Sequence, residues 1–102
     1  MIHVIASIEV NPGCQKRCLE ALKSNVPNVL AEKGCIRYEP TVDIDSGLSA
    51  QGATRTDIVT LLESWESLAA LNAHLKTPHM AAYREKVKDV VKQVRLNVLA
   101  PA

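Results

Sequence analysis

Apolar residues occupy every second position at the start of the chain. Every even position between residues 2 and 10 is apolar, and His3, Ile5, Ser7 and Glu9 stand between them. A repeat of two is typical of a β-strand, because successive side chains of an extended chain point to opposite faces. We therefore predict a half-buried strand over residues 2–10.

Apolar residues then recur every three to four positions, which predicts a helix. Asn11 is the expected cap, with Pro12 in the first turn, where its missing N–H costs nothing. Pro27 should bend or restart the helix, and Gly34 should end it in a left-handed conformation. The apolar stripe consists of Cys18, Leu19, Leu22, Val26, Val29 and Leu30.

A second helical region begins after Ser67, which we expect to cap it. Thr77 and Pro78 repeat the cap-and-proline signal, so the region should consist of two consecutive helical pieces. The first piece carries Leu68, Leu71 and Leu75 on one stripe, and the second carries Met80, Tyr83, Val87 and Val90.

Three further segments predict strands: residues 35–44, 57–65 and 93–99. Pro40 lies inside the first of them, which suggests an edge strand or a bulge, and residues 45–56 form a polar loop. The elements follow one another in the order β-α-β-β-α-β. This is the ferredoxin-like α+β arrangement, an antiparallel sheet with helices on one face.

The length of 102 residues allows one domain, which we expect to span residues 1–102. Helices on one face would leave the other face of the sheet bare. The apolar candidates for that bare face are Ile5, Val59, Leu61 and Trp65. A second copy packing sheet against sheet would remove them from water, so we predict a homodimer.

Composition excludes several classes of protein. The formal net charge is +1, with one Trp and two Tyr, which is unlike a nucleic-acid-binding surface. No uncharged apolar run reaches the roughly 18 residues of a membrane span, and the N-terminus lacks the basic region of a signal peptide. Cys14, Cys18 and Cys35 are odd in number and show no paired spacing. We therefore expect reduced thiols in a cytoplasmic protein.

The residues best suited to chemistry gather in one half of the chain: Glu63, Trp65, His74, His79 and Tyr83. Glu63 and Trp65 share a strand face. Tyr83 follows His79 by four positions, so the two lie on one helix face. The proline break between the histidines can turn both toward one cleft. A histidine is the natural general base near neutral pH, and an aromatic wall suits a planar ring substrate.

Each of these residues also has a purely structural interpretation. Trp65 can fill a core or an interface, and His74 can interact with the dipole of its helix. His79 can be a surface residue, and a metal site shared by the histidines would need a five-residue spacing across a helix break. Glu63 on an apolar strand needs a partner. Three arginines are candidates for pairing with it: Arg37, Arg84 and Arg95.

Several short motifs resemble those of a known family. An E-x-W motif at residues 63–65 precedes A-H-L-x-T-P-H-M at residues 73–80. The Asn-Pro-Gly turn at residues 11–13, the turn at residues 32–35 and the Arg-Tyr-Glu-Pro stretch at residues 37–40 complete the set. In order and spacing, over essentially the whole chain, they resemble the antibiotic biosynthesis monooxygenase domain, and within it the bacterial quinol monooxygenase branch.

The resemblance implies a fold and an activity. Family members of this kind are dimeric ferredoxin-like α/β barrels, and several oxidise quinols or polycyclic phenols with molecular oxygen without metal or flavin. We therefore expect an oxidoreductase: a cofactor-independent monooxygenase that takes a quinol or hydroxylated aromatic substrate and O₂. An ionised quinol is electron-rich enough to reduce oxygen itself, so the protein need only bind, deprotonate and shield it.

The resemblance also implies roles for individual residues. His74 is the expected base or hydrogen-bond partner of the substrate oxygen, and Glu63 is expected to orient a histidine or an arginine. The predicted substrate-binding residues are Trp65, His79, Tyr83, Tyr38 and Ser7. No cofactor-binding or metal-binding residue is predicted.

Other activities remain open. A non-catalytic dimeric module that holds a small aromatic molecule or a partner protein is one alternative, and an isomerase acting on a quorum signal, which shares the T-P-H piece, is another. Haem-degrading enzymes of the same superfamily need an asparagine on the first strand and a histidine late in the second helical region. This chain has Ser7 and Arg84 there, so haem is not expected.

Overall fold

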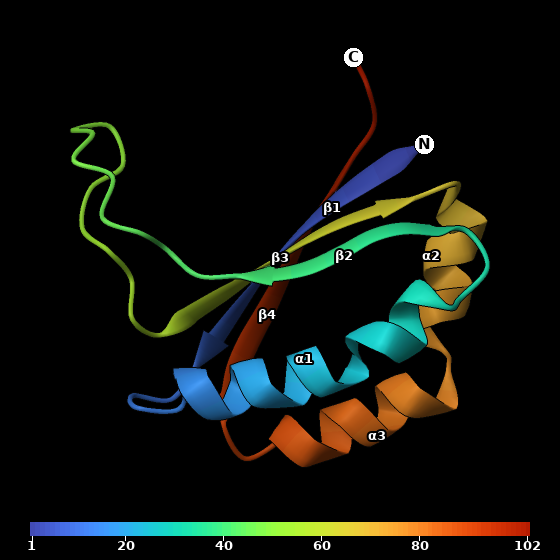
Figure 1. Ribbon diagram of the computed structural model, residues 1–102, viewed down its shortest axis with the longest axis horizontal. Coiled ribbons are helices and arrows are strands. Elements are labelled where there is room, and N and C mark those ends of the chain that lie inside the picture. The colour runs from blue at the N-terminus through green and yellow to red at the C-terminus, as the bar shows by residue number, and fades with distance from the viewer.

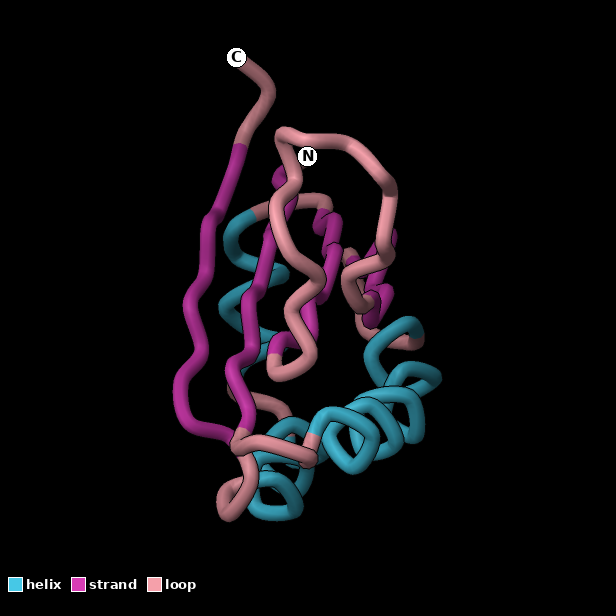
Figure 2. The backbone as a smooth tube through the Cα atoms, turned by 90° about the vertical axis from the view of Figure 1, so that its left-hand side faces the viewer, coloured by secondary structure: helices cyan, strands magenta, loops and turns pink.

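The alternating segment at the start of the chain becomes an inner strand of a four-stranded antiparallel sheet (Figure 1). The computed structural model describes residues 1–102. In chain order its elements are β1 (Ile2–Val10), α1 (Gln15–Leu30), β2 (Cys35–Thr41), β3 (Ile58–Trp65), α2 (Leu68–Leu75), α3 (Pro78–Val87) and β4 (Val91–Leu99). The strand order across the sheet is β2-β3-β1-β4, and all three neighbouring pairs are antiparallel. The helices lie on one face of the sheet (Figure 2), so the predicted ferredoxin-like α+β fold is confirmed.

Strand register decides which side chains form the core. Val4, Ala6, Ile8 and Val10 of β1 are at most 3% exposed and face the helices. In β3, Val59 pairs with Ile8 and Leu61 pairs with Ala6. Directly paired residues share a face of the sheet. Val59 and Leu61 therefore belong to the helix-covered face as well.

The prediction for the bare face was wrong for three of its four residues. Val59, Leu61 and Trp65 are 0%, 4% and 0% exposed inside the chain's own core. Strand β3 carries large apolar residues on both faces, so its sequence alone does not say which face meets the helices. Ile5 does lie on the bare face and is 37% exposed.

The start of α1 differs from the prediction. The helix begins at Gln15, and Cys14 precedes it without a side-chain cap. The Asn11 side chain instead donates to the carbonyl of Asp89, and Gly13 adopts a left-handed conformation (φ 81°). Residues 11–13 therefore form a turn ahead of the helix.

The other end of α1 also differs. The helix continues through Pro27, whose carbonyl accepts from Ala31, and it ends at Leu30. Gly34 is left-handed, as predicted, but belongs to the turn that leads into β2. A Cβ at Gly34 would lie 2.7 Å from the Cβ of Ala70, so a side chain there would push this turn away from α2.

The caps predicted for the second helical region are confirmed. The Ser67 hydroxyl accepts from the backbone N–H of Ala70, and that of Thr77 accepts from Met80. Each cap satisfies one of the N–H groups that a helix start leaves without a partner. The break at Thr77 and Pro78 therefore produces two separate helices, as expected.

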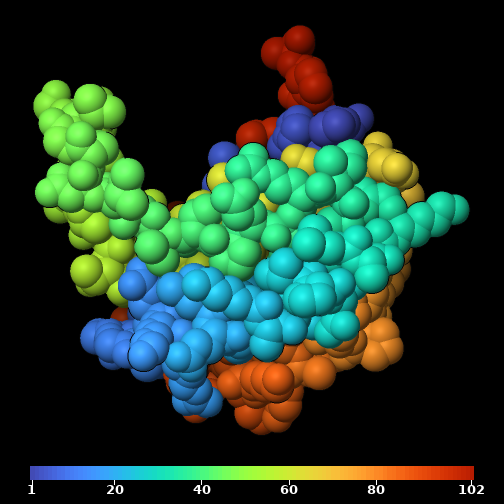
Figure 3. Space-filling view, in the orientation of Figure 1, coloured from blue at the N-terminus to red at the C-terminus, as the bar shows by residue number.

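Strand β2 lies at the edge of the sheet, as Pro40 suggested. It ends at Thr41, earlier than the predicted residue 44, and its irregular pairing falls between Cys35 and Arg37. Residues 42–57 leave the body as a projecting arm (Figure 3). Asp43 and Arg55 pair at the base of that arm. No helix of the fold has both the length and the apolar run needed to cross a bilayer.

Candidate active site

A cavity of about 220 Å³ lies between the sheet and the helices α2 and α3. It is lined by Ala6, Ile8, Tyr38, Leu61, Glu63, His74, Leu75, Met80, Tyr83, Arg84, Val94 and Leu96. Nine of these twelve residues are hydrophobic, and the polar remainder is Glu63, His74 and Arg84. Apolar walls with a few convergent polar groups are typical of a small-molecule site.

Two larger hollows lack this character. One, of about 330 Å³, lies on the bare sheet face around Ser7 and Arg95 and has a single hydrophobic lining residue. The other, of about 350 Å³, lies beside α2 and is lined mainly by small or charged side chains. The cavity beneath α2 and α3 is therefore the candidate active site.

His74 is the most constrained polar group of the cavity. Its side chain is almost fully buried, and its Nδ1 lies 2.8 Å from Oε2 of Glu32. An ionised carboxylate can only accept, so Nδ1 carries the ring proton and Nε2 keeps its lone pair. The imidazole packs against Trp65, with 4.7 Å between ring centroids, and meets Tyr38 edge-on at 5.5 Å.

Burial also sets the charge of His74. Desolvation lowers the pKa of the imidazole below its ordinary value of 6.5, and the hydrogen bond and charge of Glu32 offset this in part. Electrostatic interactions with His79 and Arg84 lower the pKa of His74 further. Near neutral pH the ring is therefore uncharged, which is the form that can accept a proton.

Glu63 has a different partner from those considered in the sequence. Its Oε1 accepts from Nε1 of Trp65 at 2.9 Å, and no histidine or arginine pairs with it. Arg37 pairs with Glu39, and Arg84 donates to the carbonyl of Leu75. Burial raises the pKa of the Glu63 carboxyl, with the Trp65 hydrogen bond acting against it.

The predicted site residues divide between the cavity and its surroundings. Tyr38 and Tyr83 line the cavity with His74 and Glu63. Burial raises the pKa of both phenols, so their hydroxyls stay protonated, and the hydroxyl of Tyr83 interacts with the Cys18 thiol. Three residues lie outside: Trp65 supports His74 from behind, His79 faces a hollow between α1 and α3, and Ser7 lies on the opposite sheet face.

Glu32 is the site residue that sequence reasoning missed. It lies in the turn between α1 and β2, 42 positions from His74. That turn is held on the β3–α2 connection, where the backbone N–H of Glu66 donates to the carbonyl of Gly34 at 2.8 Å. The close approach of Gly34 to Ala70 completes the contact. The only feature of the sequence that pointed to this region was the turn motif at residues 32–35, and that motif does not indicate what Glu32 does.

Comparisons with known proteins show the family of this chain. The family profile described as Antibiotic biosynthesis monooxygenase matches residues 1–86. The chain therefore belongs to the antibiotic biosynthesis monooxygenase family, as its motifs predicted. The Escherichia coli K12 protein named "Probable quinol monooxygenase YgiN" is 44% identical over 103 residues, which cover 99% of this chain and 98% of that protein. Family and relative together support a monooxygenase-type function, with a small molecule as substrate.

Solved structures share the fold. The Mycobacterium tuberculosis protein Rv0793 is 27% identical with a TM-score of 0.78, over 99% of this chain and 94% of that one. The Pseudomonas aeruginosa protein PA3566 is 23% identical with a TM-score of 0.82, over 99% of this chain and 93% of that one.

Proposed function

We propose that this protein is a cofactor-independent monooxygenase that oxidises a quinol or hydroxylated aromatic substrate with molecular oxygen. The observation that carries the proposal is a buried imidazole at the wall of an apolar cavity. Its Nδ1 is held by Glu32, and no protein group bonds to Nε2. The name of the Escherichia coli relative supports the substrate class.

The proposed reaction starts with a proton transfer. Nε2 of His74 takes the proton of one substrate hydroxyl, and the Glu32 carboxylate stabilises the imidazolium that forms. Arg84, on the same cavity wall, supplies positive charge for the quinolate anion. In sum, quinol and O₂ give a hydroxyquinone and water: one oxygen atom enters the ring, and the quinol supplies the electrons that reduce the other.

The remaining cavity residues bind and orient the ring. Tyr38 offers a protonated hydroxyl, and both Tyr38 and Tyr83 offer aromatic surface. Glu63 keeps one carboxyl oxygen free of protein hydrogen bonds, and that oxygen can accept from a second substrate hydroxyl. Trp65 acts through His74, whose ring it supports. The apolar walls keep water from the reacting anion.

We also propose a homodimer. The sequence suggested one because of the bare face of the sheet, whereas the structure suggests one because of apolar residues of β4 at the open side of the cavity. Val94 and Leu96 line the cavity from β4 and remain 53% and 46% exposed, and Val98 on the same face is 48% exposed. A second copy of the chain would close the cavity on this side. Sedimentation velocity at micromolar concentration should give twice the chain mass, and a monomer would contradict this part. We further expect a cytoplasmic location, which suits three free thiols.

Oxygen uptake with a naphthoquinol, prepared by chemical reduction of the naphthoquinone, tests the proposed function. The wild-type rate should exceed the protein-free rate, and His74→Gln should lose about a hundredfold or more, the range for removal of a general base. Asn72→Ala, an exposed position on the same helix, is the matched control and should keep the full rate. Uptake no faster than autoxidation across several quinols, with binding retained, would favour a non-catalytic binding module.

A further inference from the structure

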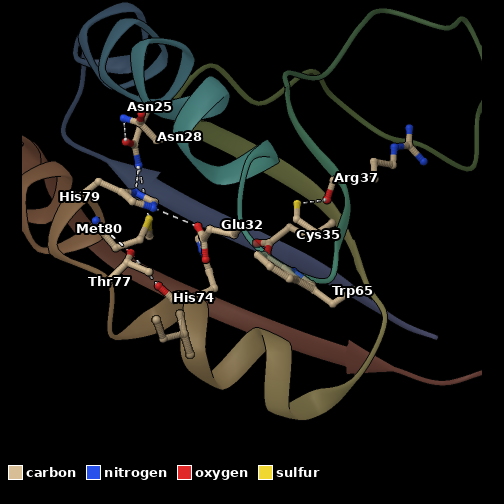
Figure 4. A network of polar contacts seen from close by, with 12 residues as sticks. Asn25, Asn28, Glu32, Cys35, Arg37, Trp65, His74, Thr77, His79 and Met80 are labelled. Atoms are coloured by element: carbon tan, nitrogen blue, oxygen red, sulfur yellow. Dashed lines mark hydrogen bonds and ion pairs between the residues drawn. The ribbon is translucent and has the colours of Figure 1, made fainter.

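A chain of polar contacts continues from the cavity into the space between α1 and α3 (Figure 4). Nδ2 of Asn28 donates to Oδ1 of Asn25 at 3.0 Å. Nδ2 of Asn25 lies 3.1 Å from Nδ1 of His79. Nε2 of His79 lies 3.0 Å from the same Glu32 oxygen that binds His74. Glu32 thus stands between two histidines from two different helices.

The hydrogen bonds of Asn25 give this chain a direction. Its Oδ1 already accepts from Asn28, and its Nδ2 also contacts Sδ of Met80 at 3.5 Å. The amide nitrogen therefore faces His79 and donates to Nδ1, which must be the unprotonated nitrogen. The proton of a neutral His79 then sits on Nε2, on the side of Glu32.

The contact between His79 and Glu32 matters because of burial. Nε2 of His79 is buried and has no well-aligned hydrogen-bond partner. A buried N–H without compensation destabilises the fold. The carboxylate 3.0 Å away is the group that compensates it, by charge more than by a linear hydrogen bond. Removing the N–H would free Glu32 to rotate, because its side chain extends from a turn.

We infer that Asn25 and His79 are positioning residues: they fix the proton of His79 on Nε2 and so hold the Glu32 carboxylate in place for His74. This inference rests on the proposed function, in which Nε2 of His74 is the base. Neither residue lines the cavity, so both act through Glu32 and not on the substrate. His79 thereby receives a role different from the substrate contact predicted for it.

Burial supports a dedicated role for Asn25. It is 8% exposed, in a helix whose other buried residues are Cys18, Leu22 and Val29. A buried amide costs free energy unless its hydrogen bonds are made, and here both ends of the amide are used. A role limited to joining α1 and α3 would predict lost stability alone. A positioning role also predicts altered histidine protonation and turnover.

Nitrogen NMR of protein labelled with ¹⁵N-histidine separates the two roles. In the wild type, His79 should show a protonated Nε2 and His74 a protonated Nδ1. Asn25→Asp keeps the shape but replaces the donor with an acceptor, so Nδ1 of His79 should gain a proton and the ring should become an imidazolium. The cation keeps its Nε2–H and attracts the Glu32 carboxylate more strongly than the neutral ring does, so Glu32 should move from His74 toward His79 and the His74 signals should move away from those of the pure Nδ1–H form.

Turnover completes the test. Asn25→Asp should lower kcat about tenfold, the lower end of losses known for outer partners that orient a functional histidine, with KM unchanged. Asn28→Ala, which removes only the bond that orients Asn25, should act in the same direction more weakly. Ser24→Ala is the matched control, because Ser24 lines the same hollow and bonds only to the carbonyl of Ala21.

Three results would overturn the inference: a wild-type His79 protonated on Nδ1, unchanged histidine signals in Asn25→Asp, or altered signals with a wild-type kcat. Should the wild type oxidise no quinol at all, the proposed function fails instead. The NMR spectra would still decide whether Asn25 sets the histidine tautomers, since they need no substrate.

Discussion

The helix-side face of the sheet is filled in one half and open in the other. On β1, Ala6 and Ile8 are 2% and 3% exposed, whereas their direct partners on β4, Leu96 and Val94, are 46% and 53% exposed. The paired side chains point to the same side, so the difference comes from the helices, which pack mainly against β2 and β3. The cavity is therefore the part of the core that the helices leave unfilled.

This origin explains the chemistry of the cavity. On the side of β1, β3 and α3 its walls include core residues, so the dielectric constant near them is low and charged groups are disfavoured. Burial therefore keeps the His74 imidazole neutral, and the Glu32 carboxylate, which opposes this only in part, orients the ring without entering the cavity lining. The filled half gives stability, and the open half provides room for a planar ring.

The largest expected effect is on the free energy of unfolding, and two alanine variants compare the filled and the open half directly. Ile8→Ala in the filled half should lower the free energy of unfolding by about 2–5 kcal/mol, the usual range for a core truncation. Leu96→Ala in the open half should change it by only about 0.5 kcal/mol in the dilute chain. Urea unfolding of both variants measures the difference, and equal losses would contradict the division into halves.

Turnover should respond strongly to Glu32. Glu32→Gln keeps the size of the side chain but removes the charge that holds the His74 imidazolium. We expect kcat for quinol oxidation to fall about a hundredfold, within the range of general acid–base contributions, with KM nearly unchanged. Steady-state oxygen uptake gives both constants. A normal kcat in a folded variant would remove Glu32 from the mechanism.

The pH dependence of kcat/KM should be moderate. Because burial lowers the pKa of His74 below 6.5, the base form persists as the pH falls through neutrality. The acid limb of the kcat/KM profile should therefore have its midpoint below pH 6.5, where the ring gains its proton. Glu63→Gln should leave that midpoint in place. A midpoint above 6.5 would show that His74 is not the titrating base.

The smallest expected effect concerns the open half in the assembled protein. If a second copy covers β4, stability becomes dependent on protein concentration. Leu96→Ala should then lose more stability at high concentration than at low concentration, because it weakens association. Thermal unfolding over a hundredfold range of concentration measures this. A melting temperature independent of concentration, in both proteins, would leave the open half without a partner.

The pattern of the sequence predicted the elements well because their signals are local. Ser67 and Thr77 cap α2 and α3 as expected, since a hydroxyl before a helix has few other uses. Asn11 misled the same reasoning, because its amide reaches the carbonyl of Asp89, 78 positions away. Local signals fail where a distant group competes for the same side chain.

The site was predicted less completely, for the same reason. The motif that brought His74 to attention is contiguous, whereas Glu32 reaches it only after the turn has docked on α2. We predicted Trp65 on the bare sheet face because β3 carries apolar residues on both faces. Only the pairing of β3 with β1 decides to which face the Trp65 side chain points. The strand register and the docking of the turn on α2 depend on tertiary contacts, and the hydrophobic periodicity of the sequence does not reveal them.

A structure with an oxidised naphthoquinone bound tests the central claim most directly. We expect the ring in the cavity beneath α2 and α3, with one oxygen within about 3 Å of Nε2 of His74. The ring should lie between Tyr38 and Tyr83. A ring bound on the bare sheet face near Ser7, or in the hollow between α1 and α3 beside His79, would contradict it.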